Sequence, residues 1–105
     1  MQIRVINTPS KGTLRILTKK VTDASMREYL AKERISAVGL IQGQVSEIIV
    51  AADIAEKAAN VEVAEISGSC PQHFTVLGIF GETSAVDTAL DAINKWDKLE
   101  NKVKK

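Results

Sequence analysis

The residues of this chain best suited to chemistry fall in one six-residue stretch: Gly68, Ser69, Cys70, Pro71, Gln72 and His73. The stretch holds the only cysteine, the only histidine and one of the two prolines of the chain. A thiolate and an imidazole can ligate metal ions, whereas glycine and proline favour a turn. Strand-like runs at 61–66 and 74–80 flank it, so we interpret it as a loop between two strands.

A single thiol per chain limits what Cys70 can do. It cannot form a disulfide within the chain, which is consistent with a reducing compartment. One thiolate is also too few for a metal site built from the cysteines of one chain. Two interpretations stay open: Cys70 is a small turn residue with no metal, or several copies of Cys70 meet in an oligomer.

The remaining polar residues form no recognisable catalytic set. His73 lacks the second cysteine or histidine at the spacing of a zinc site. Asp53 and Glu56 are three residues apart on a predicted helix, but no third partner suggests acid–base catalysis. The chain has neither glycine-rich phosphate-loop motif. We therefore expect a protein that is not an enzyme.

Composition narrows the possible partners. The 105 residues correspond to one domain, with 45% hydrophobic and 26% charged residues and a net charge of +1. This charge gives no general attraction to nucleic acid, and only four aromatic residues are available for stacking on bases. No run approaches the roughly 18 apolar residues of a membrane span. We expect a cytosolic protein that binds neither nucleic acid nor membrane.

Hydrophobic periodicity predicts eight elements. Strands are expected at about 2–7, 13–19, 36–42, 61–66 and 74–80, and helices at about 22–32, 45–59 and 84–96. From residue 36 onward the order is most of a ferredoxin-like unit without its last strand. The N-terminus must then supply that strand, as in a circular permutation. The fold class is α/β (α+β), with an antiparallel-rich sheet and helices on one face.

Two segments resemble the signatures of a known family. Residues 51–62, Ala-Ala-Asp-Ile-Ala-Glu-Lys-Ala-Ala-Asn-Val-Glu, are similar to the helix-to-strand signature of bacterial microcompartment (BMC) shell domains. Residues 81–86 resemble the second, glycine-turn-helix signature. The resemblance covers 36–96, and the N-terminal pattern resembles the permuted members. The loop is similar to that of the GrpU-type shell proteins of glycyl-radical propanediol microcompartments.

The resemblance implies a single BMC shell domain over 1–105. Residues 1–35 would be the permuted N-terminal part, 36–97 the core and 98–105 a charged tail. The family forms flat homohexamers that tile into a shell in the bacterial cytoplasm. Residues 68–73 would line the central pore, and Lys57 would pack against its counterpart at the hexamer edge.

The GrpU-type resemblance further implies an iron–sulfur cluster, of the [4Fe–4S] type, shared between subunits at the pore through Cys70. The cluster would pass electrons across the shell or be delivered to its interior. Partners would be other shell proteins and encapsulated redox or activating enzymes. Two alternatives stay open: a metal-free tile whose pore passes metabolites, and a small oligomeric ferredoxin-like sensor that binds an effector.

Overall fold

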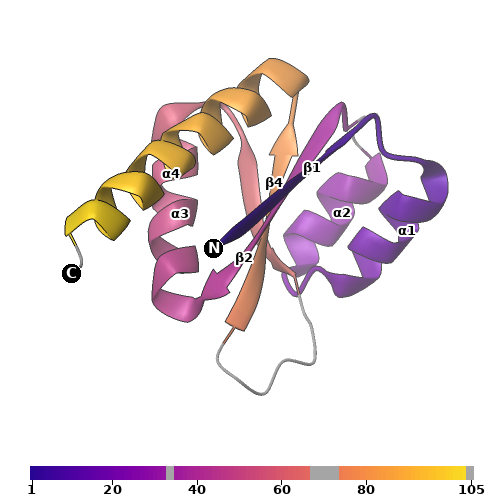
Figure 1. The fold of residues 1–105 in the computed structure, drawn as a ribbon. Coiled ribbons are helices and arrows are strands. Elements are labelled where there is room, and N and C mark those ends of the chain that lie inside the picture. Colours follow the sequence, from indigo (N-terminus) through magenta and orange to yellow (C-terminus); the bar gives the residue numbers. More distant parts are fainter. Residues whose placement is uncertain (33–34, 67–73, 104–105) are drawn as a thin grey trace.

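The computed structural model describes residues 1–32, 35–66 and 74–103, and the chain forms an antiparallel sheet between two layers of helices (Figure 1). The elements are β1 (Gln2–Asn7), α1 (Lys11–Lys20), α2 (Ala24–Lys32), β2 (Ala37–Gln44), α3 (Val45–Ala58), β3 (Glu62–Ile66), β4 (Phe74–Gly81) and α4 (Thr83–Val103). The strand order is β1-β2-β4-β3, and each neighbouring pair is antiparallel. The predicted α/β fold with an antiparallel sheet is thus confirmed.

The N-terminus supplies the edge strand that the core lacks. β1 pairs with β2 along its whole length, from Gln2 opposite Gln42 to Asn7 opposite Ala37. β2 lies inside the sheet, between β1 and β4. Its first residues are buried without alternation, because helices cover both faces of the sheet. The sequence-based prediction that the missing strand comes from residues 2–7 therefore agrees with the topology.

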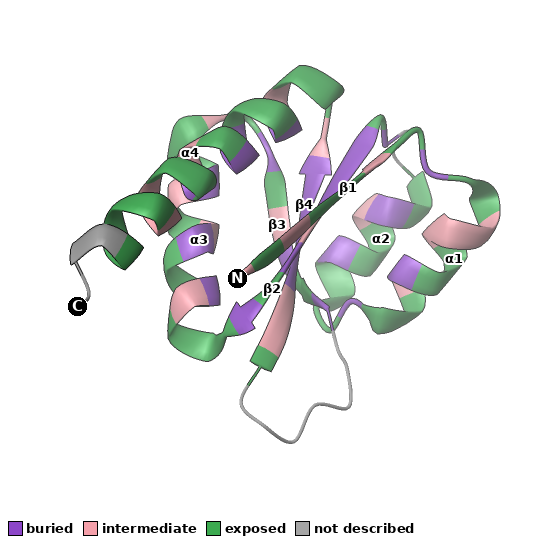
Figure 2. Ribbon diagram, viewed as in Figure 1, coloured by how far each residue is buried: buried purple, intermediate pink, exposed green. Residues whose placement is uncertain are grey.

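The helices lie on both faces of the sheet, so the expectation that they share one face is wrong. α3 and α4 cover one face, where Ala51 and Ala55 of α3 pack in a buried cluster with Ile79 and Ile93. α1 and α2 cover the other face, around Phe80. Figure 2 shows the buried residues of each helix pair facing the strands. Alternating side chains of a strand point to opposite faces, so β2 and β4 contribute to both cores.

The prediction of a strand at 13–19 is also wrong, because these residues belong to α1. The Ser10 side chain accepts a hydrogen bond from the backbone N–H of Thr13 at 3.2 Å, which caps the helix. Leu14 and Leu17, three residues apart, pack in the α1–α2 core. Ile16, which suggested alternation with Leu14, is 58% exposed. Two apolar positions are too few to distinguish the two-residue period of a strand from the 3.6-residue period of a helix.

The last helix is longer than expected. α4 continues to Val103, so most of the predicted charged tail from residue 98 is helical. Lys104 and Lys105 lie outside the described residues. Among the helices of residues 1–32, 35–66 and 74–103, none combines the length and apolar character that a membrane crossing requires.

Candidate functional site

The predicted pore loop, Gly68–His73 with Cys70 and its neighbours, lies outside the described residues, but the structure fixes both ends of the connection. β3 ends at Ile66 and β4 begins at Phe74. The two strands are antiparallel neighbours, and Ile66 is opposite Val76. The seven residues between them therefore leave and re-enter the sheet at the same end, as the sequence predicts for a loop joining paired strands.

The first end of this connection is held on both sides. Ile66 is buried and pairs with β4 on one side and with Val21 on the other. The backbone N–H of Thr22 donates to the carbonyl of Glu65 at 3.3 Å. The Thr75 hydroxyl donates to a carboxylate oxygen of Glu65, also at 3.3 Å. The segment after α1 thus closes part of the β3 edge and fixes the point from which the loop departs.

The second end of the connection lies beside the N-terminus. Phe74 is opposite Gln44, the last residue of β2, and its side chain is 42% exposed. A cavity of about 290 Å³ is lined by Met1, Gln2, Gln42, Gly43 and Phe74. Among its lining side chains, the polar ones are the glutamine amides on adjacent strands, which can donate and accept hydrogen bonds without carrying charge. Sequence reasoning missed this cavity, because it depends on the β1–β2 register.

Lys57 lies at the other end of the sheet from the loop. α3 starts where β2 ends, next to Phe74, and its last turn leads to Glu62, which is opposite Phe80 at the far end of β4. The structure therefore does not bring Lys57 together with the loop. The separation is compatible with the expectation that the loop lines the pore and that Lys57 packs at the hexamer edge.

The Lys57 side chain is exposed and paired. Its ammonium lies 2.8 Å from a carboxylate oxygen of Asp53, and 77% of its side chain is accessible. The hydrogen bond to Asp53, together with the charge of that carboxylate, raises the pKa of Lys57 above its ordinary value. Lys57 is therefore a protonated, accessible side chain on an outer helix face. Within the described part of the chain, Asp53 and Glu56 show no further partner that would make them an acid–base pair.

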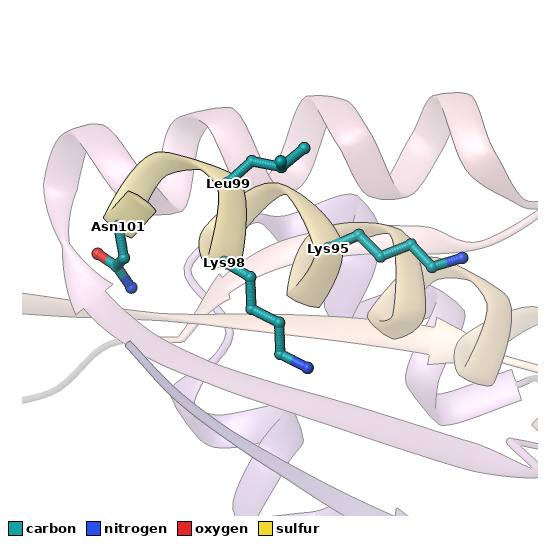
Figure 3. A pocket seen from close by; sticks show the side chains of 4 residues that line it. All are labelled: Lys95, Lys98, Leu99 and Asn101. Carbon is teal, nitrogen blue, oxygen red and sulfur yellow. The ribbon is translucent and has the colours of Figure 1, made fainter. Parts of the chain in front are cut away.

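A larger hollow follows the last turns of α4. It has a volume of about 710 Å³, and Lys95, Lys98, Leu99 and Asn101 line it (Figure 3). Lys95 pairs with Asp91 at 3.1 Å, and Leu99 is 63% exposed. Its described lining therefore combines an exposed apolar side chain with cations and holds no candidate metal ligand.

The described residues contain no metal-binding group by themselves. Among residues 1–32, 35–66 and 74–103, no three histidine, cysteine, aspartate or glutamate side chains gather closely enough to hold an ion. The chain has one cysteine and one histidine, both in the loop. Any cluster bound through thiolates must therefore draw on more than one chain.

Known proteins agree with this fold. Residues 37–103 match the BMC domain model. No curated protein matches the sequence. Among solved structures, the ligand-free GrpU microcompartment shell protein from Pectobacterium wasabiae is 38% identical, over 89% of this chain and 99% of that one, with a TM-score of 0.71. The GrpU shell protein from Clostridiales bacterium 1_7_47FAA is 36% identical, over 93% of each chain, with a TM-score of 0.69.

A more distant structure supports the fold alone. The fused permuted hexameric shell protein MSM0275 from the RMM microcompartment is 24% identical, over 90% of this chain and 44% of that one, with a TM-score of 0.69. The family match spans more than half of the chain, and the two GrpU structures cover nearly all of it. The chain therefore belongs to the BMC-domain family of bacterial microcompartment shell proteins.

Proposed function

We propose that this shell protein forms a homohexameric tile whose pore loop binds a [4Fe–4S] cluster through Cys70 of several subunits. The observation that carries the proposal is the position of the only thiol. It stands four residues from Ile66 and four from Phe74, two strand ends that the fold holds in place. Four residues span at most about 14 Å, so the thiol is tethered near this end of the sheet.

The donor set fits a shared cluster and not a cluster within one chain. A ring of six subunits would offer six thiols around one axis, and a cubane uses four. Gly68 permits close backbone approach and Pro71 restricts the backbone. Ser69, Gln72 and His73 would complete the pore lining, with His73 as a neighbour of the cluster or an occasional ligand. Once bound, such a cluster supplies one-electron exchange.

Similarity to the GrpU shell proteins supports this role over other shell functions. The two GrpU structures are more than 35% identical to this chain. We propose that the protein relays electrons across the shell or delivers a cluster to the interior. Other shell proteins and enclosed redox or activating enzymes would be its partners, in a glycyl-radical propanediol compartment. Lys57 would pack at the tile edge, for which its exposure and its distance from the loop are suitable.

Anaerobic purification tests the cluster. Wild-type protein, reconstituted with iron and sulfide where needed, should be brown, with charge-transfer absorption in the visible range. Cys70→Ala should be colourless and keep the oligomeric mass of the wild type, whereas Ser69→Ala should keep the colour. A colourless reconstituted wild type would rule the cluster out.

A redox titration separates the two roles of the cluster. An electron relay requires that the visible spectrum return after repeated reduction and reoxidation with no loss of iron. Loss of iron in each cycle would exclude the relay and favour delivery.

A metal-free pore is the second candidate, because the cavity beside the loop is lined by uncharged amides of Gln2 and Gln42. Such a lining suits small polar metabolites. It predicts a colourless wild type that still forms hexagonal sheets, visible by electron microscopy. Membership in the shell family leaves the alternative of a free effector-binding sensor without support.

A further inference from the structure

The last turn of α3 carries a short, exposed ion pair. Nζ of Lys57 lies 2.8 Å from Oδ2 of Asp53, which is one helical turn earlier in the chain. The ion pairs on α2 and α4 measure 3.3 Å and 3.1 Å. In the part of the chain that the structure describes, Lys57 therefore makes the shortest ion pair.

The partner of Lys57 sets the direction of its side chain. Lys57 is in the last turn of α3, where the free backbone carbonyls of a helix also attract cations. The ammonium instead pairs with Asp53, on the N-terminal side of Lys57, the direction in which helical side chains lean. Asp53 thus fixes where the charge of Lys57 lies and places an opposite charge beside it.

The pair contributes little to the stability of the single chain. The exposed fractions of the two side chains are 77% for Lys57 and 61% for Asp53. Exposed ion pairs four residues apart on a helix contribute little in water. The same pair matters more where a partner covers it, because charges interact more strongly once water is excluded. We therefore examine what the pair does at a contact between chains.

The surface around the pair is suited to such a contact. Ile49 precedes Asp53 by one helical turn and is 66% exposed, and Val45, a further turn back, is 47% exposed. Residues four apart lie in one row on a helix, so two aliphatic side chains and the ion pair share a row. Figure 2 shows that the side of α3 away from the sheet is exposed in the single chain. A partner that covered this row would bury apolar area and charge together.

The edge role proposed for Lys57 raises an electrostatic problem. Packing of Lys57 against its counterpart on a neighbouring tile brings two ammonium groups close together. Like charges repel, and burying a charge without a partner is costly. A carboxylate held beside each ammonium removes most of this cost, since each tile then presents a neutral pair.

We propose that Asp53 is a positioning residue of the tile edge, whose carboxylate orients and neutralises the Lys57 ammonium so that two tiles can meet. The inference rests on the edge role proposed for Lys57 and adds that the lysine needs its acidic neighbour. Glu56 is nearer to Lys57 in sequence, but adjacent residues of a helix do not face each other. Lys57 pairs with Asp53 instead.

Sheet assembly at different salt concentrations tests the proposal. Turbidity of the full chain gives the lowest protein concentration at which sheets form, and electron microscopy identifies hexagonal tiles. Asp53→Asn should raise this concentration about tenfold or more at low salt, because the unpaired lysines repel each other. At about 1 M NaCl, which screens charges beyond about 3 Å, it should return to within about threefold of wild type.

Matched variants separate positioning from general charge. Glu56→Gln removes the same charge from the adjacent position of α3 and should leave assembly within about twofold of wild type. Asp53→Glu keeps a carboxylate four residues before Lys57 and should assemble like wild type. Lys57→Ala tests the edge role itself and should impair assembly at both salt concentrations. Native mass spectrometry checks that each variant keeps the oligomeric mass of wild type, so that loss of sheets reports on the edge and not on the ring.

Three results would overturn the proposal and leave the edge role of Lys57 intact. The first is Asp53→Asn assembly equal to wild type at low salt, and the second is an equal loss in Glu56→Gln. The third is a loss in Asp53→Asn that salt does not relieve, because the carboxylate would then contact the neighbouring tile itself. Wild-type assembly of Lys57→Ala would instead remove the edge role and this inference with it. None of these measurements involves iron or Cys70, so the pore proposal stands or fails separately.

Discussion

At the scale of single residues, the ring of Phe80 leaves no room for a side chain at position 78. Both residues lie on β4, two positions apart, so they share a face of the sheet. A Cβ at position 78 would lie 2.6 Å from Cζ of Phe80 and 3.1 Å from Cδ1 of Ile66. Phe80 is fully buried in the α1–α2 core. The glycine therefore makes room for the largest side chain of that core.

Gly78→Ala should accordingly lower the free energy of unfolding by about 1–3 kcal/mol, the usual cost of overpacking. Gly81→Ala is the matched control, because it lies on the same strand and the nearest atoms to its Cβ would be 3.5 Å away, an ordinary contact. Urea unfolding at one fixed protein concentration gives both values. Equal stability of wild type and Gly78→Ala would mean that Phe80 can move aside.

Lys57 allows a prediction about titration. Asp53 raises the pKa of Lys57 in the folded protein. While Asp53 is ionised, the pair therefore stabilises the fold at pH values below the unfolded lysine pKa of about 10.4. That contribution is lost as the pH rises through the folded pKa. NMR titration of the Lys57 Cε resonance should give a midpoint above the ordinary lysine value. In Asp53→Asn the Lys57 midpoint should fall towards that ordinary value, and an unchanged midpoint would contradict the pairing.

At the scale of elements, the helical conformation of α1 depends on its N-terminal cap and on its packing against α2. The Ser10 hydroxyl accepts from the backbone N–H of Thr13, and Leu17 is 5% exposed. Ser10→Ala should cost about 1 kcal/mol, whereas Ser10→Asp should retain most of the stability because a carboxylate also caps helices. Gly12→Ala should add about 0.5–1 kcal/mol, since Gly12 is inside the helix and its Cβ would meet only the Arg15 side chain, at 3.9 Å. No loss in Ser10→Ala would mean that packing against α2 holds the start of the helix without the cap.

The same element marks the limit of what could be predicted from the sequence. α3 and α4 could be predicted because each has many apolar positions at helical spacing, and β2 because a short continuous apolar run is typical of a strand covered on both faces. α1 could not, because Leu14 and Ile16 fit a strand as well as Leu14 and Leu17 fit a helix. The end of the sheet that carries the loop followed from the strand order, but the cavity at Met1 and Phe74 required the β1–β2 register.

At the scale of the whole molecule, the sheet separates two helical layers with different charge. The α3–α4 side carries Lys57 at one end of the sheet, and the β3–β4 connection with Cys70 leaves from the other end. The α1–α2 side carries the four cations of α1. One chain supplies one thiol, so a metal site with several thiolates requires the assembly of several chains.

Assembly therefore gives the sharpest prediction for the cluster. When wild-type and tagged Cys70→Ala chains are coexpressed at varied ratios, each hexamer contains a random mixture of the two. A cluster that needs about four thiolates is lost only from rings with too few wild-type chains. Iron should therefore follow a sigmoid curve, which changes little while most chains are wild type and then falls more steeply than the wild-type fraction. Native mass spectrometry should show at most one cluster per six chains. Iron that falls in direct proportion to the wild-type fraction would mean that each chain binds its own metal, because independent sites do not depend on their neighbours.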